Sequence, residues 1–144
     1  MNILQKMCVP GLLAVVAIWT AAQQKTEITK EPAPMTSASS GSEMYKSYCA
    51  ACHGSSGKGD GPAAAALKTA PPDLTTLAKR NNGKYPTLRV ISILRGQEQL
   101  VAHGNQEMPV WGPVFHSLDI SAPNSVTELR IHNLSQYLES LQAK

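Results

Sequence analysis

The sequence predicts an all-α domain with long loops, and three observations support this fold class. Apolar residues recur at helical spacing in the middle of the chain and near its end. Connectors rich in Gly and Pro separate the helical segments, at residues 54–62, 69–72 and 104–113. No stretch shows a convincing alternation of apolar and polar residues, which is the pattern typical of a half-buried strand.

The first part of the chain is expected to lie outside this domain. Lys6 precedes a run of sixteen uncharged, mostly apolar residues that ends at Ala22. This layout predicts a signal peptide over residues 1–22. Sixteen helical residues span about 24 Å, less than the roughly 30 Å of a bilayer core, so an uncleaved N-terminal anchor is the second choice. Residues 23–41 are polar and predict a flexible leader, which leaves a domain at 42–144.

Two helices are predicted in the first half of the domain. Ser42 precedes a short helical segment at 43–51 and is expected to cap it. A second short helix should cover residues 74–80, directly after Asp73. It should end before Asn82-Gly83, a pair that favours a turn.

Two longer helices are predicted in the second half. Pro86 should open a helix over residues 87–95, and Gly96 should stop it. The C-terminal helix has the strongest signal, because Ser125 to Glu128 has the form of a capping box. An apolar stripe follows at Ile131, Leu134, Leu138 and Leu141.

Composition and charge limit the function classes. The net charge of +3 is too small to indicate nucleic-acid binding, and no basic cluster is interleaved with aromatic residues. Only 5% of the residues are aromatic, so a flat apolar cofactor would supply bulk that the core lacks. Residues 44–95 carry a net charge of +6 and residues 96–144 a net charge of −3. Such asymmetry can steer a protein toward an oppositely charged partner.

The decisive motif is Cys49-Ala50-Ala51-Cys52-His53. Two thiols three positions apart on a helical turn can join the two vinyl groups of one haem, and the adjacent histidine then faces the iron. A zinc site would need further ligands at close spacing, and the domain has no other cysteine. A redox-active pair would suit a strand-then-helix setting that this sequence lacks. Because haem attachment uses both cysteines of the motif, the third cysteine, Cys8, needs no disulfide partner inside the domain.

The sixth iron ligand follows by elimination among the methionines. Met1 and Met7 lie in the signal, Met35 lies in the leader, and Met44 precedes the attachment motif on the same helix. Met108 remains, in a Pro-containing loop that can cross the distal face of the haem. The rival ligands are His103 and His116, or a five-coordinate iron.

The sequence resembles the class I (mitochondrial-type) cytochromes c, and in particular small bacterial monohaem electron carriers. CAACHG, GKGDGP, PPDL and EMPVWG occur in that order before a closing helix, and the resemblance covers residues 42–144. It implies a small globule of about four to five helices around one covalently bound haem c, with the N- and C-terminal helices crossing. It also implies that the Pro72 carbonyl accepts the Nδ1–H of His53, although PPDL leaves Pro71 as an alternative.

Several other residues are candidate haem contacts. Trp111 would either donate its indole N–H to a haem propionate or pack against the haem edge. Tyr85, Arg89 and Arg95 are further propionate candidates, although residues of these types are more often surface residues. The residues expected to wall the haem are Leu67, Leu74, Leu77, Ile91, Leu94 and Phe115.

These observations predict an electron carrier rather than an enzyme. A haem enzyme or ligand-binding haem protein, the alternative, would need an open distal position, which Met108 would block. The expected partners are redox proteins: a haem-copper oxidase, a quinol-oxidising complex or a periplasmic dehydrogenase. No nucleic-acid partner is expected, and the membrane is contacted only if residues 1–22 stay uncleaved. The expected location is the bacterial periplasm.

Overall fold

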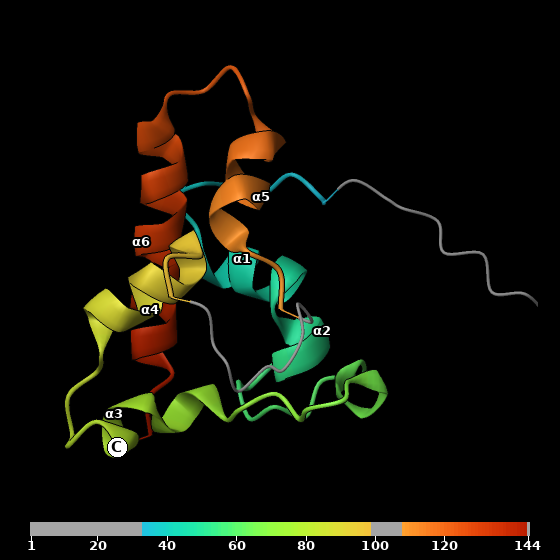
Figure 1. The fold of residues 1–144 in the computed structure, drawn as a ribbon, viewed down its shortest axis with the longest axis vertical. Coiled ribbons are helices and arrows are strands. Elements are labelled where there is room, and N and C mark those ends of the chain that lie inside the picture. The colour runs from blue at the N-terminus through green and yellow to red at the C-terminus, as the bar shows by residue number, and fades with distance from the viewer. Residues whose placement is uncertain (1–32, 99–107, 144) are drawn as a thin grey trace, which may run out of the picture. The chain divides into compact units, whose positions relative to one another are not determined.

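A computed structural model describes residues 33–98 and 108–143, and within these ranges the chain forms helices and loops without strands. The predicted signal peptide at 1–22 and most of the leader lie outside the described residues. The described part contains six α-helices: α1 (Gly41–Tyr48), α2 (Ala50–His53), α3 (Leu77–Arg80), α4 (Thr87–Arg95), α5 (Trp111–Leu118) and α6 (Asn124–Ser140). Two short 3-10 helices, η1 (Ala64–Ala66) and η2 (Leu74–Thr76), accompany them (Figure 1). The all-α prediction is confirmed.

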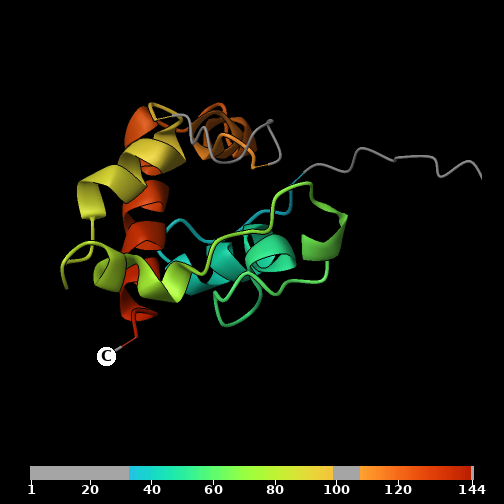
Figure 2. The ribbon, with the colours of Figure 1, turned by 60° about the horizontal axis from the view of Figure 1, so that its bottom comes forward.

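The α1 helix crosses the long C-terminal helix α6, as predicted (Figure 2). Gly41 makes the close approach feasible, because a Cβ at this position would lie 2.1 Å from the Asn133 carbonyl oxygen. One turn later, the ring of Tyr45 packs against the ring of Tyr137 with centroids 5.3 Å apart. The crossing therefore depends on a residue without a side chain followed by an aromatic residue one turn further along the same face.

The core lies between α6 and the three helices that pack on it, α1, α4 and α5. The predicted stripe on α6 supplies Ile131, Leu134 and Leu138 to this core, and all three are buried. Leu141, the last member of the stripe, is partly buried at the edge of the core. The remaining buried apolar residues of the core are Met44, Tyr45, Cys49, Val90, Leu94, Trp111 and Phe115.

The first predicted helix begins earlier and is interrupted. The side chain of Ser40, not Ser42, caps α1 by accepting a hydrogen bond from the backbone N–H of Glu43. The helix ends at Tyr48, and a separate turn, α2, follows from Ala50 to His53. The prediction of one helix over 43–51 was therefore wrong at both ends, because Ser40 caps the helix earlier and Cys49, with φ −112°, separates α1 from α2.

The predicted capping box of the last helix is absent. Here α6 begins at Asn124, one residue before Ser125, with Pro123 at the N-cap position and no side-chain cap. The carboxylate of Glu128 instead pairs with Arg95 at the end of α4. A tertiary ion pair thus replaces the local hydrogen bond that the sequence pattern indicated.

The two middle predictions are confirmed. Residues 74–80 form η2 and α3, and Asn82 and Gly83 follow with φ values of 55° and 80°. The α4 helix covers the predicted span and ends at Gly96, which has φ 80°. A Cβ on Gly96 would lie 2.1 Å from a methyl group of Val110, so packing as well as backbone conformation favours glycine at this position.

The α5 helix was not predicted, since its first three residues fall in the connector assigned to residues 104–113. Pro113 lies in its first turn, where proline does not remove an intrahelical hydrogen bond. Trp111 and Phe115, four residues apart, both point into the core. That spacing was the signal in the sequence that a helix starts here.

Residues 33–40, which the sequence assigned to the leader, pack against the domain. Thr36 is buried, and its hydroxyl lies 2.9 Å from the Tyr48 hydroxyl and accepts a hydrogen bond from Arg130 at 3.0 Å. The side chain of Asn133 donates to the Ala38 carbonyl at 2.8 Å. This N-terminal strap, residues 33–40, thus belongs to the folded unit, which extends further upstream than residue 42. In the part of the chain that the structure describes, no helix is long and apolar enough to cross a membrane.

Candidate functional site

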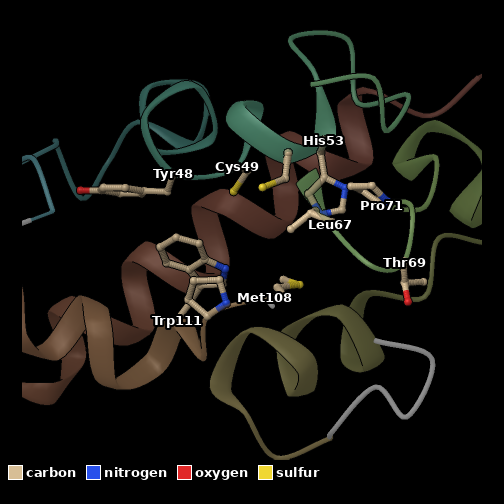
Figure 3. Close-up of a pocket in the computed structure, with 10 residues that line it drawn as sticks. Tyr48, Cys49, His53, Leu67, Thr69, Pro71, Met108 and Trp111 are labelled. Carbon is tan, nitrogen blue, oxygen red and sulfur yellow. The ribbon is translucent and has the colours of Figure 1, made fainter. Parts of the chain in front are cut away.

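An open pocket brings the chemistry-bearing residues together (Figure 3). Its walls are mostly apolar. The lining residues are Tyr48, Cys49, Cys52, His53, Leu67, Thr69, Pro71, Met108, Pro109 and Trp111.

The attachment motif forms one edge of the pocket. Backbone hydrogen bonds from Cys52 and His53 to the Cys49 carbonyl wind the motif into a helical turn, at 3.1 and 2.9 Å. Both thiols are free of any disulfide. Burial raises the pKa of the Cys49 thiol to about 12, with a smaller contribution from Cys52. The Cys49 sulfur is therefore a neutral thiol at the rim of an apolar pocket.

The loop after the motif holds His53 in place. Gly54 has φ 77°, which turns the chain sharply, and the backbone N–H of Gly59 donates to the His53 carbonyl at 2.8 Å. The buried hydroxyl of Tyr45 donates to the Gly54 carbonyl at 2.7 Å. The carbonyl of His53 and that of Gly54 are thus each fixed by a hydrogen bond, which anchors the backbone that carries the His53 side chain.

The ring of His53 faces a proline carbonyl. Its Nδ1 lies 3.3 Å from the carbonyl oxygen of Pro72, while Pro71 contributes to the pocket wall. Of the two prolines that the sequence left open, Pro72 is thus the one whose carbonyl meets the ring. A hydrogen bond from Nδ1–H would fix the tautomer and the orientation of the imidazole.

Met108 lines the same pocket, across the gap from His53 (Figure 3). It is half-buried and lies just before Pro109, three residues ahead of the start of α5. The rival His103 lies outside the described residues, and the other rival, His116, is exposed on α5 and does not line the pocket. Met108 is therefore the candidate sixth ligand that the described geometry brings to the site.

Trp111 closes the pocket beside Met108. Only 6% of Trp111 is exposed, and its ring packs on Tyr48 and Phe115 with centroids 5.5 and 5.7 Å away. The indole N–H makes no hydrogen bond to any described residue. This arrangement is compatible with both expectations for Trp111, namely packing against the haem edge and donation of the indole N–H to a haem propionate.

The other propionate candidates have partners elsewhere. The Tyr85 hydroxyl donates to the Ser135 carbonyl at 3.0 Å, Arg89 pairs with Glu98, and Arg95 pairs with Glu128. Of the six residues expected to wall the haem, only Leu67 lines the pocket; the others belong to the helical core or pack against it. The sequence could not separate the two roles, because both require apolar side chains.

Sequence reasoning missed three lining residues, Tyr48, Thr69 and Pro109. Tyr48 directly precedes Cys49, and Pro109 directly follows Met108, so adjacency to a candidate ligand was the available signal. Thr69 carried no such signal. It reaches the pocket because residues 62–72 pass beneath the attachment turn, where the backbone N–H of Ala63 bonds to the Ala51 carbonyl at 2.9 Å.

These side chains fit a covalently bound haem. Two free thiols, an imidazole and a thioether surround one apolar pocket, and that donor set suits an iron porphyrin attached by its vinyl groups. The all-α fold and this pocket define a small haem-attachment domain.

Comparison with known families agrees with this class of protein. Residues 38–142 match the family model for cytochrome c, so the chain belongs to the cytochrome c family. Its cofactor is a covalently attached haem c with its iron, and the function of the family is haem-based electron transfer. No curated protein and no solved structure matches the chain.

Proposed function

We propose that this protein is a monohaem electron carrier in which Cys49 and Cys52 hold the haem and His53 and Met108 are the axial ligands of the iron. The proposal rests on the meeting of these four side chains in one pocket, from segments more than fifty residues apart in the sequence. A domain built for catalysis would instead need an open distal position with an acid or base over it. In this proposal the thioether of Met108, which lines the pocket together with His53, takes that position.

The protein residues would set the properties of the carrier. The haem supplies the one-electron couple of its iron. The thioether of Met108 favours the ferrous state and raises the reduction potential relative to bis-histidine ligation. The Pro72 carbonyl would keep the His53 ring oriented and basic. Trp111 would offer its indole N–H to a haem propionate, and the apolar walls would keep water away from the iron.

We also propose an exported location and redox-protein partners. The apolar run at 1–22 has the layout of a secretory signal, and the haem-attachment motif is consistent with maturation outside the cytoplasm. In this reading the protein passes electrons in the bacterial periplasm between partners such as a quinol-oxidising complex, a periplasmic dehydrogenase and a haem-copper oxidase. Purification of the protein from native membranes, with identification of co-purifying redox complexes, would test these partners.

Replacement of Met108 tests the ligand assignment. Met108→Ala should keep the haem attached, lower the reduction potential and allow carbon monoxide to bind the reduced protein rapidly, because the sixth position opens. Optical spectra and a redox titration measure both effects. The control is Met35→Ala, since Met35 is 63% exposed on the strap and should behave as wild type.

Two outcomes would contradict the proposal. If Met108→Ala keeps the wild-type spectrum and potential, Met108 is not the ligand, and His103 becomes the next residue to replace. If the wild-type reduced protein itself binds carbon monoxide rapidly, the distal position is open. The chain would then be a ligand-binding haem protein or a haem enzyme.

A further inference from the structure

The end of the chain is tied to the segment that carries the Pro72 carbonyl. Gln142, two residues past the end of α6, uses its side-chain amide for three hydrogen bonds. Its Nε2 donates to the carbonyls of Leu74 and Leu138, at 2.8 and 2.7 Å, and its Oε1 accepts from the backbone N–H of Ala78 at 2.8 Å. Two carbonyls on one side and an N–H on the other leave no ambiguity about the orientation of the amide.

A backbone contact extends the same connection. The N–H of Ala143 donates to the Thr75 carbonyl at 2.9 Å. The C-terminal tail is thus bonded to η2 at Leu74 and Thr75 and to α3 at Ala78. Figures 1 and 2 both show the end of α6 beside α3.

Leu74 is held from both sides. Its N–H donates to the Gly57 carbonyl of the attachment loop at 2.7 Å, and its C=O accepts from Gln142. Side chains also converge at this point, because a Cβ on Gly57 would lie 3.5 Å from Leu141, Thr75 and Tyr45. The peptide groups of Leu74 therefore link the attachment loop to the end of α6.

Pro72 is only two residues before Leu74, so the position of Leu74 limits where the Pro72 carbonyl can lie. The side chain of Asp73, between them, accepts a hydrogen bond from the N–H of Thr75 at 2.8 Å. This bond restricts the backbone conformations that the segment can adopt. The distance of 3.3 Å between His53 Nδ1 and the Pro72 oxygen exceeds the usual 2.9 to 3.0 Å for an N–H···O bond. A small shift of the segment would therefore change this contact strongly.

We propose that Gln142 is a positioning residue that holds the Pro72 carbonyl against His53 and so sets the basicity of this ring as an iron ligand. The inference rests on the proposed ligation of the iron by His53. A more strongly hydrogen-bonded imidazole is more basic and stabilises ferric iron, so loosening the contact raises the reduction potential. Gln142 thereby tunes the haem through the backbone of the segment that carries Pro72 and Leu74.

The test compares four variants of the full-length holoprotein. Gln142→Ala removes all three side-chain bonds, and Gln142→Glu keeps the acceptor for Ala78 but loses the donors to Leu74 and Leu138. Gln136→Ala is the composition control, since Gln136 is exposed on α6. Tyr85→Phe is the structural control, because it removes another hydrogen bond to α6, at Ser135, far from Pro72 in the sequence.

Both Gln142 variants should raise the reduction potential and speed solvent exchange of the His53 Nδ1 proton, followed by NMR in the reduced state. The Leu74 and Ala143 amide protons, which bond to the Gly57 and Thr75 carbonyls, should exchange on the order of fivefold faster, because the segments that hold these bonds lose their connection through Gln142. Gln136→Ala should match wild type. Tyr85→Phe should lower thermal stability while leaving the potential and the His53 proton unchanged.

Three results would overturn the inference. Unchanged Leu74 and Ala143 exchange would mean that the connection does not hold in solution. Faster amide exchange with an unchanged potential and an unchanged His53 proton would make Gln142 a purely structural residue. An equal shift in Tyr85→Phe would make the effect nonspecific. Failure of the proposed ligation is separate, because it would show in the wild-type oxidised protein as His53 ring resonances without hyperfine shifts.

Discussion

At the scale of single residues, Tyr45 connects the packing of the core to the attachment turn. The residue is fully buried, and its hydroxyl donates to the Gly54 carbonyl directly after His53. Burial, with smaller contributions from Cys49, Tyr137 and Asp60, raises the pKa of Tyr45 to about 12 from an ordinary value of 10.0. Tyr85 behaves similarly, since burial raises its pKa to about 12 although the hydrogen bond with Ser135 opposes the shift.

These two tyrosines predict a loss of stability in alkali. The unfolded chain releases the phenolic protons near pH 10 and the folded protein only near pH 12, so the unfolded state binds fewer protons between these values. The free energy of unfolding should therefore be constant with respect to these groups below pH 10 and fall as the pH rises toward 12. Denaturant unfolding followed by circular dichroism measures this dependence.

The variant Tyr45→Phe separates the two contributions. It should be less stable than wild type by about 1 kcal/mol at neutral pH, because the hydrogen bond to Gly54 is lost. Its free energy of unfolding should fall less steeply between pH 10 and 12, since only Tyr85 then contributes. Identical alkaline slopes in the variant and wild type would show that Tyr45 does not titrate as inferred.

At the scale of elements, the N-terminal strap completes the environment of a buried arginine. Arg130 on α6 is 4% exposed, and its guanidinium donates to the Thr36 hydroxyl. The ion pairs found among residues 33–98 and 108–143 are Arg89–Glu98 and Arg95–Glu128, and neither involves Arg130. A buried cation that lacks a bonded carboxylate depends on polar groups such as this hydroxyl. The strap therefore contributes to stability and not only to the connection with the upstream chain.

Replacing Thr36 tests the strap. Thr36→Val keeps the shape but removes the hydroxyl that meets both Arg130 and Tyr48, so we expect a loss of roughly 1–3 kcal/mol in the free energy of unfolding. Ser39→Ala is the matched control, because Ser39 is exposed on the strap, and it should change stability by no more than about 0.5 kcal/mol. Equal stability of Thr36→Val and wild type in denaturant unfolding would mean that the strap is dispensable.

At the scale of the whole molecule, the asymmetry of charge bears on docking. The basic segment 44–95 contains the attachment motif and the loop with Leu67 and Thr69, which line the pocket. Lys58 and Lys68 are exposed on this segment, and Lys68 lies between two lining residues in the sequence. A partner with an acidic surface would thus be steered toward the side from which the haem is reached.

Charge reversal tests this steering. Lys58→Glu combined with Lys68→Glu should slow association with an acidic redox partner and leave the reduction potential nearly unchanged, since exposed charges are well screened. Wild-type association should fall steeply with salt, as the Debye length shrinks from about 30 Å at 0.01 M to about 8 Å at 0.15 M. Stopped-flow kinetics measures both effects.

The control for this experiment is Lys79→Glu with Lys84→Glu. This variant makes the same change in net charge at α3 and the turn after it, away from the lining loop in the sequence. It should slow association less than the first variant. Salt-independent kinetics, or equal rates in the charge-reversed and wild-type proteins, would indicate docking through an apolar patch instead.

The features that the sequence alone determined are those encoded by short spacings. The Cys49–Cys52–His53 motif predicts a haem-attachment turn because three neighbouring residues carry the chemistry, and the family match agrees with that cofactor. Helices at 87–95 and at the C-terminus follow from local periodicity and from stop signals such as Gly96. Elimination among the five methionines of the sequence also predicts Met108 as the candidate sixth ligand.

Only the tertiary structure decided the features that depend on residues distant in the sequence. Three features are of this kind. The carbonyl of Pro72 rather than that of Pro71 lies next to His53, and Glu128 pairs with Arg95 in place of a capping box. Residues 33–40 also belong to the fold. Each of these features depends on polar groups that could form hydrogen bonds or ion pairs of similar free energy with several other partners. A hydrogen bond or ion pair is worth only about 1 kcal/mol net, so the packing of α1, α4 and α5 on α6 selects among them.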